Sequence, residues 1–252
     1  MSLVVDGVSK AFGGLQVLDA VSFSAPTHER TGIVGPNGAG KSTLFACISG
    51  FIRLDRGAVH FESHDLTQAT PVSAARWGLV RTFQVPRPYR HMTVRDNLLA
   101  AAPSQSGERL RNLFLAPRQV RREEAAIRQR AEEVLGFLRL QSLANQQASE
   151  LSGGQLKLLE LGRVLMTKPK LIMLDEPFAG VHPVLIEQLC THMTSLNEQG
   201  IGCVVIEHNL GALAELVSRL IVLDRGKIIA DGSPSAVLSD PNVGAAYVGR
   251  PQ

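Results

Sequence analysis

The sequence has few cysteines, few aromatic residues and no long apolar run. Its 252 residues include three cysteines, one tryptophan and two tyrosines. An odd number of thiols without metal-ligand spacing, each within an apolar pattern, is typical of buried cysteines in a reducing compartment. The scarcity of cysteine therefore argues against a disulfide framework and against a cysteine metal site.

Excess charge and a targeting segment are also missing. The net charge is only +3, with no lysine tract and no aromatic-basic alternation, so nothing here predicts nucleic-acid binding. Residues 1–6 reach an acidic residue almost at once, unlike a secretory signal, and no apolar stretch approaches the length that spans a membrane. We expect a chain without a membrane span, which leaves room for a membrane-embedded partner.

A glycine-rich turn is the strongest local pattern that is present. It reads Gly35-Pro36-Asn37-Gly38-Ala39-Gly40-Lys41-Ser42, after an apolar run and before a helical one. This is the phosphate-loop pattern in its expected setting, where backbone N–H groups and a helix N-terminus converge on an anion. Lys41 would neutralise phosphates and Ser42 would offer an oxygen to Mg²⁺. The alternative, an ordinary glycine turn, does not explain the Lys-Ser pair.

Apolar runs alternate with helical patterns over much of the chain. Strands are expected at residues 3–5, 17–23, 58–61, 79–83, 171–174, 202–206 and 220–223, with a hairpin arm at 226–232. Helices are expected at residues 43–50, 72–77, 118–140, 156–167, 183–199 and 210–218. The pattern predicts an α/β fold with a mainly parallel sheet covered on both faces, beside an antiparallel layer at the N-terminus.

A change in composition marks an inserted helical subdomain. Two prolines at residues 86 and 88 break regular structure, and the pattern is helical from Val94 onward. We expect a core of residues 1–86 and 156–252 and a helical subdomain at about 87–155. Within it, residues 118–140 place apolar positions among many Arg and Glu, which predicts an amphipathic helix with a solvated charged face.

Two adjacent carboxylates follow the apolar strand at 171–174. Asp175 and Glu176 would lie at the carboxyl end of a parallel strand, where one can complete a Mg²⁺ shell and the other can orient or deprotonate a water. A helix cap is the alternative for a lone Asp-Glu pair. Pro177 and the wholly apolar strand before the pair argue against it.

The stretch Leu151-Ser152-Gly153-Gly154-Gln155 opens a further helix and could receive an anion. Together with the phosphate loop, Gln84 and the carboxylate pair, it resembles the LSGGQ signature of ATP-binding cassette (ABC) proteins over nearly the whole chain. The resemblance implies a P-loop NTPase fold and an ATPase that binds ATP and Mg²⁺. It also implies that two cassettes face head to tail, each ATP lying between one phosphate loop and the other signature.

The resemblance assigns roles by motif position. It implies phosphate and Mg²⁺ contacts by Lys41, Ser42 and Thr43, a metal partner in Asp175, and a catalytic base in Glu176. Gln84 resembles the residue that senses Mg²⁺ and water, and His208 the switch histidine at the γ-phosphate. Contacts in trans are implied for Ser152, Gly153, Gly154 and Gln155, and adenine contacts for Phe12 and Val17. Taken alone, His208 and Phe12 would be a strand-end histidine and a turn aromatic.

The sequence departs from the family pattern at two places. His182 stands where most relatives carry Asp or Asn, and the loop of residues 27–30 lacks the glycine that usually precedes the phosphate-loop strand. An imidazole at position 182 would add a pH-dependent charge near the nucleotide, and neutral drift is the alternative explanation for the histidine. The missing glycine affects only local turn geometry.

Several stretches resemble the ATPase subunits of branched-chain amino acid importers. They are residues 81–84, 92–99, 158–163, 206–209 and 246–249, although residues 177–181 and the same tail are similar to a lipopolysaccharide exporter ATPase. The importer resemblance implies a second nucleotide-binding subunit, membrane permeases, a substrate-binding protein and a peripheral position on the cytoplasmic face of the inner membrane. A soluble ABC ATPase acting on ribosomes or DNA, or a binding module without turnover, remains an alternative. The compact single cassette argues against a soluble ATPase on ribosomes or DNA. The presence of Glu176 and His208 argues against a binding module without turnover.

Overall fold

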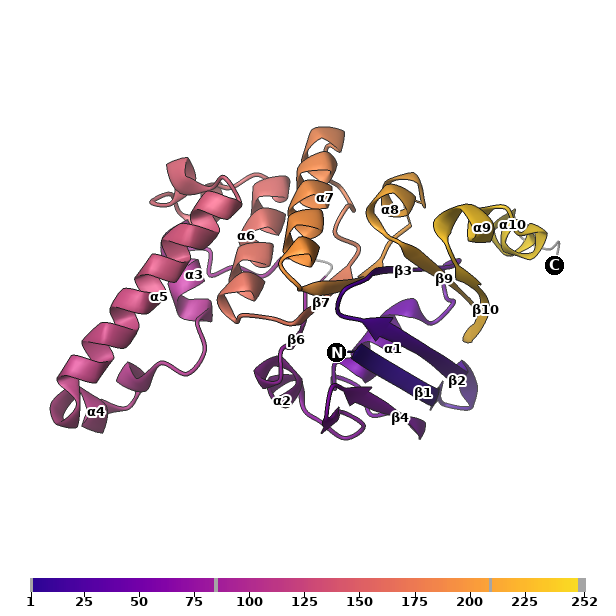
Figure 1. Ribbon diagram of the computed structural model, residues 1–252, viewed down its shortest axis with the longest axis horizontal. Coiled ribbons are helices and arrows are strands. Elements are labelled where there is room, and N and C mark those ends of the chain that lie inside the picture. The colour runs from indigo at the N-terminus through magenta and orange to yellow at the C-terminus, as the bar shows by residue number, and fades with distance from the viewer. Residues whose placement is uncertain (1, 84–85, 209, 249–252) are drawn as a thin grey trace. The chain divides into compact units, whose positions relative to one another are not determined.

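The computed structural model describes residues 2–83, 86–208 and 210–248 (Figure 1). The chain divides into two compact units. Unit 1 comprises Met1–Gln84, Lys170–Ala179 and Ile186–Gln252, and unit 2 comprises Val85–Pro169 and Gly180–Leu185. No helix among the described residues is both long enough and apolar enough to cross a bilayer.

Unit 1 contains an antiparallel sheet of order β2-β1-β4-β5. Its strands are β1 Ser2–Phe12, β2 Leu15–Pro26, β4 Arg56–Phe61 and β5 His64–Asp65. The turn between β1 and β2 uses Gly13 and Gly14, both at positive φ, as a tight hairpin requires. The predicted N-terminal antiparallel layer is thereby confirmed, with strands that are longer than expected and interrupted by register shifts.

The second sheet of unit 1 has the order β10-β9-β3-β8-β7-β6. Its strands are β3 Arg30–Val34, β6 Leu79–Arg81, β7 Leu171–Asp175, β8 Gly202–Ile206, β9 Arg219–Asp224 and β10 Lys227–Gly232. All pairings are parallel except that of β10 with β9. Because parallel strands end at one edge, the segments that follow β3, β7 and β8 emerge beside one another.

Helices cover this framework in unit 1. They are α1 Lys41–Ile48, α2 Pro71–Arg76, most of α7 Pro183–Glu198, α8 Leu210–Leu216, α9 Pro234–Leu238 and α10 Pro241–Val248. Helix α1 is fully integrated into the core, where Phe45 and Ile48 join residues of both sheets such as Phe61 and Met173. This packing fixes the helix that follows the glycine-rich turn.

Unit 2 consists of helices. They are α3 Val94–Ala101, η1 Ser106–Glu108, α4 Leu110–Leu115, α5 Pro117–Phe137, η2 Gln141–Leu143, η3 Ala148–Glu150 and α6 Gly153–Met166. Gly162 of α6 lets side chains of Leu98, Val134 and Leu138 approach closely, since a Cβ there would lie 2.9 Å from Leu98. Helix α5 buries Val120, Ala131, Val134 and Leu135 and leaves its charged face exposed, as predicted.

Two of the element boundaries that differ from the prediction have a clear physical cause. Strand β6 ends at Arg81 because the Thr82 hydroxyl accepts from Asp175 N (3.3 Å), so a side chain replaces the next backbone ladder bond. Helix α6 begins at Gly153 because Ser152 and Gln155 form a capping box, which starts the helix before the first apolar position.

Candidate active site

The loop between β3 and α1 has a backbone that only glycine can supply at two positions. A Cβ on Gly35 would lie 1.9 Å from the Leu223 carbonyl oxygen, and one on Gly40 would lie 2.7 Å from that of Val17. Gly40, at φ 102°, is the N-cap of α1 and gives the helix no side-chain cap among the described residues. The first-turn N–H groups of α1 therefore remain available to an anion.

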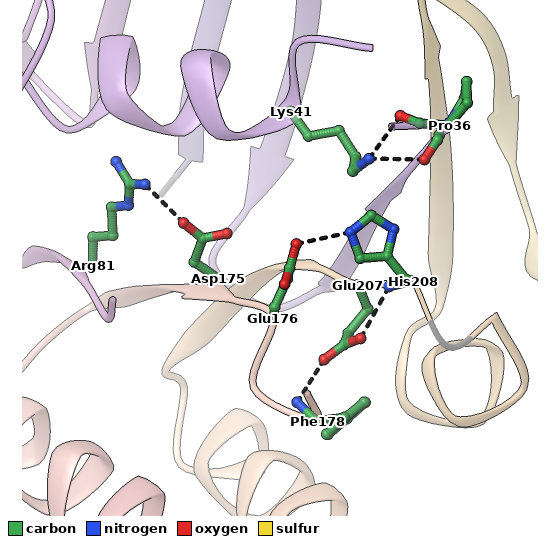
Figure 2. Close-up of polar contacts among 9 residues, drawn as sticks. Pro36, Lys41, Arg81, Asp175, Glu176, Phe178, Glu207 and His208 are labelled. Carbon is green, nitrogen blue, oxygen red and sulfur yellow. Dashed lines mark hydrogen bonds and ion pairs between the residues drawn. The ribbon is translucent and has the colours of Figure 1, made fainter. Parts of the chain in front are cut away.

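Lys41 is the cation of this loop, and it is buried, with 6% of its surface exposed. Its Nζ donates to the carbonyl oxygens of Gly35 (2.7 Å) and Pro36 (3.0 Å), as Figure 2 shows. Burial lowers the pKa of Lys41, and the charges of Glu176 and Asp175 partly offset that effect. An anion bound in the loop would favour the charged form of Lys41, which burial disfavours.

Asp175 ends the fully buried strand β7, and its carboxylate forms an ion pair with Arg81. Arg81 Nη2 lies 2.7 Å from Asp175 Oδ2, and the two side chains are only 11% and 8% exposed (Figure 2). Arg81 Nη1 also approaches Ser49 Oγ (3.4 Å), at the end of α1. Arg81 is a site residue that was not predicted from the sequence, although a basic residue that ends an apolar strand was a signal for a buried partner.

Glu176 and His208 meet across the ends of β7 and β8. His208 Nε2 lies 2.8 Å from Glu176 Oε1, and Glu176 N donates to the Ile206 carbonyl (2.9 Å). Glu176 has a positive φ of 49°, a costly conformation for a side-chain-bearing residue and one that clusters at functional sites. The structure thus brings together two of the residues predicted to act in catalysis.

Glu207 is a site residue that sequence reasoning missed. It is 3% exposed, and its two oxygens accept from Phe178 N (2.5 Å) and His208 N (2.9 Å) (Figure 2). This carboxylate therefore links the segment after β7 to the segment after β8, and so helps to position Glu176 and His208 beside each other. The available signal was a carboxylate placed between a wholly apolar strand and a histidine.

A cavity of about 220 Å³ is shared by the glycine-rich loop, Glu176 and His208. It is lined by Val17, Asn37, Gly38, Ala39, Gly40, Lys41, Ser42, Thr43, Glu176 and His208. Phe12 is not among the lining residues; its ring is 46% exposed and lies 5.3 Å from Lys10 Nζ. Gln84 lies outside the described residues.

The predicted signature residues Ser152 to Gln155 belong to unit 2. Ser152 Oγ accepts from Gln155 N (3.3 Å), and Gln155 Oε1 accepts from Ser152 N (2.9 Å). They open the 14-residue helix α6, whose N-terminus carries a partial positive charge. His182, also in unit 2, is exposed.

Comparison with known proteins gives a consistent result. The family described as "ABC transporter" matches residues 18–179. The chain is 42% identical to the probable branched-chain amino acid transport ATP-binding protein LivG of Methanocaldococcus jannaschii, over 98% of this chain and 97% of that protein. It is 35% identical to the high-affinity branched-chain amino acid transport ATP-binding protein LivG of Salmonella typhimurium, over 98% of both.

Solved structures agree with this result. A nucleotide-free ATP-binding cassette from an ABC transporter superposes with a TM-score of 0.86 at 42% identity, covering 99% of this chain and all of that one. The ADP conformation of an ATP-binding cassette gives the same TM-score, identity and coverage.

Proposed function

The chain belongs to the ABC transporter family, and on that premise we propose that it hydrolyses ATP to drive uptake of branched-chain or similar amino acids through membrane permeases. The observation that carries the proposal is the single cavity shared by Lys41, Ser42, Glu176 and His208. The relatives named as branched-chain amino acid transport proteins support the cargo.

The residues of the cavity fit a nucleotide phosphate chain. The loop of residues 35–40 requires glycine where a Cβ at Gly35 or Gly40 would collide with the carbonyl oxygen of Leu223 or Val17, and buried Lys41 supplies a positive charge. Contacts to phosphate would come from Gly35, Pro36, Asn37, Gly38, Ala39, Gly40, Lys41, Ser42 and Thr43. Phe12 and Val17 would contact the adenine ring.

The donor set also fits Mg²⁺, which when bound neutralises phosphate charge. Ser42 Oγ and Asp175 are hard oxygen donors of the kind that Mg²⁺ prefers, and Gln84 would add an amide oxygen. Arg81 pairs with Asp175 Oδ2 and so orients the carboxylate, whose other oxygen would bind the metal.

Glu176 would act as the general base. Water forms a bond to the γ-phosphorus, the bond to the bridging oxygen of ADP breaks, and Glu176 accepts the water proton. His208 would donate to the γ-phosphate, and its contact with Glu176 holds both groups at the cavity. Glu207 would position them through backbone N–H groups.

The site would be completed by a second cassette. Ser152, Gly153, Gly154 and Gln155 of one copy would bind the nucleotide held by the phosphate loop of the other, in a homodimer or heterodimer. The dimer would act at the cytoplasmic face of the membrane with permeases and a substrate-binding protein.

The test uses two variants of the full chain. Glu176→Gln should bind ATP and hydrolyse it at least about a hundredfold more slowly, since a general base contributes roughly 10²–10⁴. Lys41→Ala should weaken nucleotide binding itself, measured by titration calorimetry. Full turnover by Glu176→Gln, or unchanged affinity in Lys41→Ala, would contradict these assignments.

The cargo needs a separate experiment. The chain is purified with candidate permeases, and ATP hydrolysis is measured in proteoliposomes with candidate binding proteins and ligands. Stimulation by leucine, isoleucine or valine would support the importer. Stimulation only by a lipopolysaccharide, without any binding protein, would support an exporter instead.

A further inference from the structure

A cluster of apolar side chains protrudes from unit 2, outside the site described above. Among the described residues, the three most exposed large apolar side chains are Leu110 (75%), Phe114 (84%) and Leu115 (81%). All three lie on the six-residue helix α4, which packs only against α5 and η1 among its main contacts. Figure 1 shows α4 at the amino-terminal end of α5. Large apolar side chains that are exposed together on one short helix are typical of an interaction surface.

The helix that carries these side chains is anchored rather than loose. Asn112 Nδ2 donates to the Ser106 carbonyl (2.9 Å), and Glu123 accepts from both the amide and the hydroxyl of Ser106. Val120, at the start of α5, is buried. These hydrogen bonds and the burial of Val120 fix the position of α4, and its exposed apolar side chains therefore point outward.

The same segment is strongly basic. Residues 109–122 contain five arginines and no acidic residue, which gives a local charge of +5. All five are exposed, and none forms an ion pair within the described part of the chain. They are Arg109, Arg111, Arg118, Arg121 and Arg122.

Two of the three neighbouring carboxylates are already engaged, and the third, the exposed Glu108, leaves a net charge of +4 over residues 108–122. Glu123 binds Ser106 and Gln119, and Glu124 pairs with Arg128 (3.5 Å). The arginines are therefore free to attract an external anion. The chain holds a basic apolar patch, which we define as Leu110, Phe114 and Leu115 with these five arginines.

We propose that the basic apolar patch binds the surface of a bilayer that contains anionic lipids. Leucine and phenylalanine side chains on a short helix insert at the boundary between headgroups and acyl chains, and guanidinium groups pair bidentately with lipid phosphates. Protruding side chains need no complementary pocket in a fluid bilayer, whereas an acidic protein partner would have to supply one. The patch adds an attachment to lipid that is independent of any permease.

The experiment measures flotation of the full chain with vesicles that contain no protein. Phosphatidylcholine vesicles are compared with vesicles that also contain phosphatidylglycerol. We expect binding to the anionic vesicles only, weakened by added salt because surface charges are screened. Binding to neither kind of vesicle, or equal binding to both, would overturn the proposal.

Matched variants assign the binding to the patch. The triple variant Leu110→Ser/Phe114→Ser/Leu115→Ser and the double variant Arg118→Gln/Arg121→Gln should each bind at least about tenfold more weakly. The controls are Val72→Ser, which removes another exposed apolar side chain, and Arg53→Gln/Arg56→Gln, which changes the net charge equally. Both controls should bind like the original chain.

Three results would contradict the assignment. Patch variants that bind as tightly as the controls would place the binding elsewhere. Equal losses of vesicle binding in the patch variants and the controls would show that binding depends only on the net charge of the chain. Variants that keep vesicle binding but lose co-purification with a permease would identify an acidic protein surface as the partner. ATP hydrolysis without vesicles is measured in parallel, so this proposal can fail while the proposed function stands.

Discussion

At the scale of single residues, the site depends on charges that are buried in pairs. Arg81 and Asp175 are both almost enclosed, and Glu207 is enclosed with two backbone N–H donors. Burial of an unpaired charge costs free energy. Removing one partner therefore destabilises the fold mainly because the other charge stays buried without compensation. These groups hold the carboxyl ends of β7 and β8 in place.

Removal of the Arg81 charge should therefore be strongly destabilising. Arg81→Met leaves the Asp175 carboxylate buried without its main partner and should lower the free energy of unfolding by about 3–5 kcal/mol. Lys227→Met is the control, because the Lys227–Asp19 pair is exposed and should contribute less than about 1 kcal/mol. Urea denaturation measures both. A loss below 1 kcal/mol in Arg81→Met would show that the ion pair has no such role.

Cys203 should make stability depend on alkaline pH. Burial raises its pKa to about 12, from an ordinary value of 9.0. Between these values the unfolded chain loses the thiol proton and the folded chain keeps it, so stability is complete below pH 9 and falls as pH rises. At pH 10, one pH unit above the ordinary pKa of 9.0, the loss of stability is about 1.4 kcal/mol.

The control for this prediction is Cys203→Ala. The gap in unfolding free energy between the original chain and Cys203→Ala should shrink by that amount between pH 8 and pH 10. A gap that stays constant over this range would mean that the thiol ionises equally in both states.

At the scale of elements, the parallel sheet explains why distant segments meet at one site. The loop after β3, Glu176 after β7 and His208 after β8 are brought together because the three strands run side by side in one direction. Apolar runs predicted these strands well, since β7 and β8 are buried on both faces. The glycine spacing likewise predicted a loop that needs positive φ, and Gly35, Gly38 and Gly40 all have positive φ.

Other features could not be predicted from local pattern. Arg81 and Glu207 acquire their roles from partners 94 and 29 residues away, and a linear pattern does not specify such tertiary contacts. The early end of β6 depends on the Thr82 hydroxyl, which competes with the backbone ladder only once β7 lies beside it. Gln84, predicted from its motif, stays a prediction because it lies outside the described residues.

The capping box should contribute to stability independently of any nucleotide. Ser152→Ala removes the acceptor for Gln155 N and should cost about 1 kcal/mol. Ser149→Ala, three residues earlier and exposed, should cost less than about 0.5 kcal/mol. Thermal and urea unfolding of the monomer without nucleotide measure both. Equal stability of the two variants would show that the cap does not stabilise α6.

At the scale of the whole molecule, the two units carry different parts of the function. Unit 1 holds the proposed phosphate loop and the proposed catalytic carboxylate, and unit 2 carries the predicted signature helix and the basic apolar patch. The central claim is that the cavity around Lys41 is half of a nucleotide site, which a second cassette completes through Ser152. Closure with ATP and reopening after hydrolysis would then follow from contacts that exist only while the γ-phosphate is present.

The most direct test is the association state of the Glu176→Gln chain in sedimentation velocity. We predict that Glu176→Gln is a dimer with Mg²⁺ and ATP and a monomer with ADP. The variant Glu176→Gln/Ser152→Phe should stay a monomer with Mg²⁺ and ATP. Its affinity for ATP should equal that of Glu176→Gln, measured at concentrations where Glu176→Gln is still a monomer. A dimer that persists in Glu176→Gln/Ser152→Phe with ATP would contradict the claim that the signature of one copy completes the site of the other.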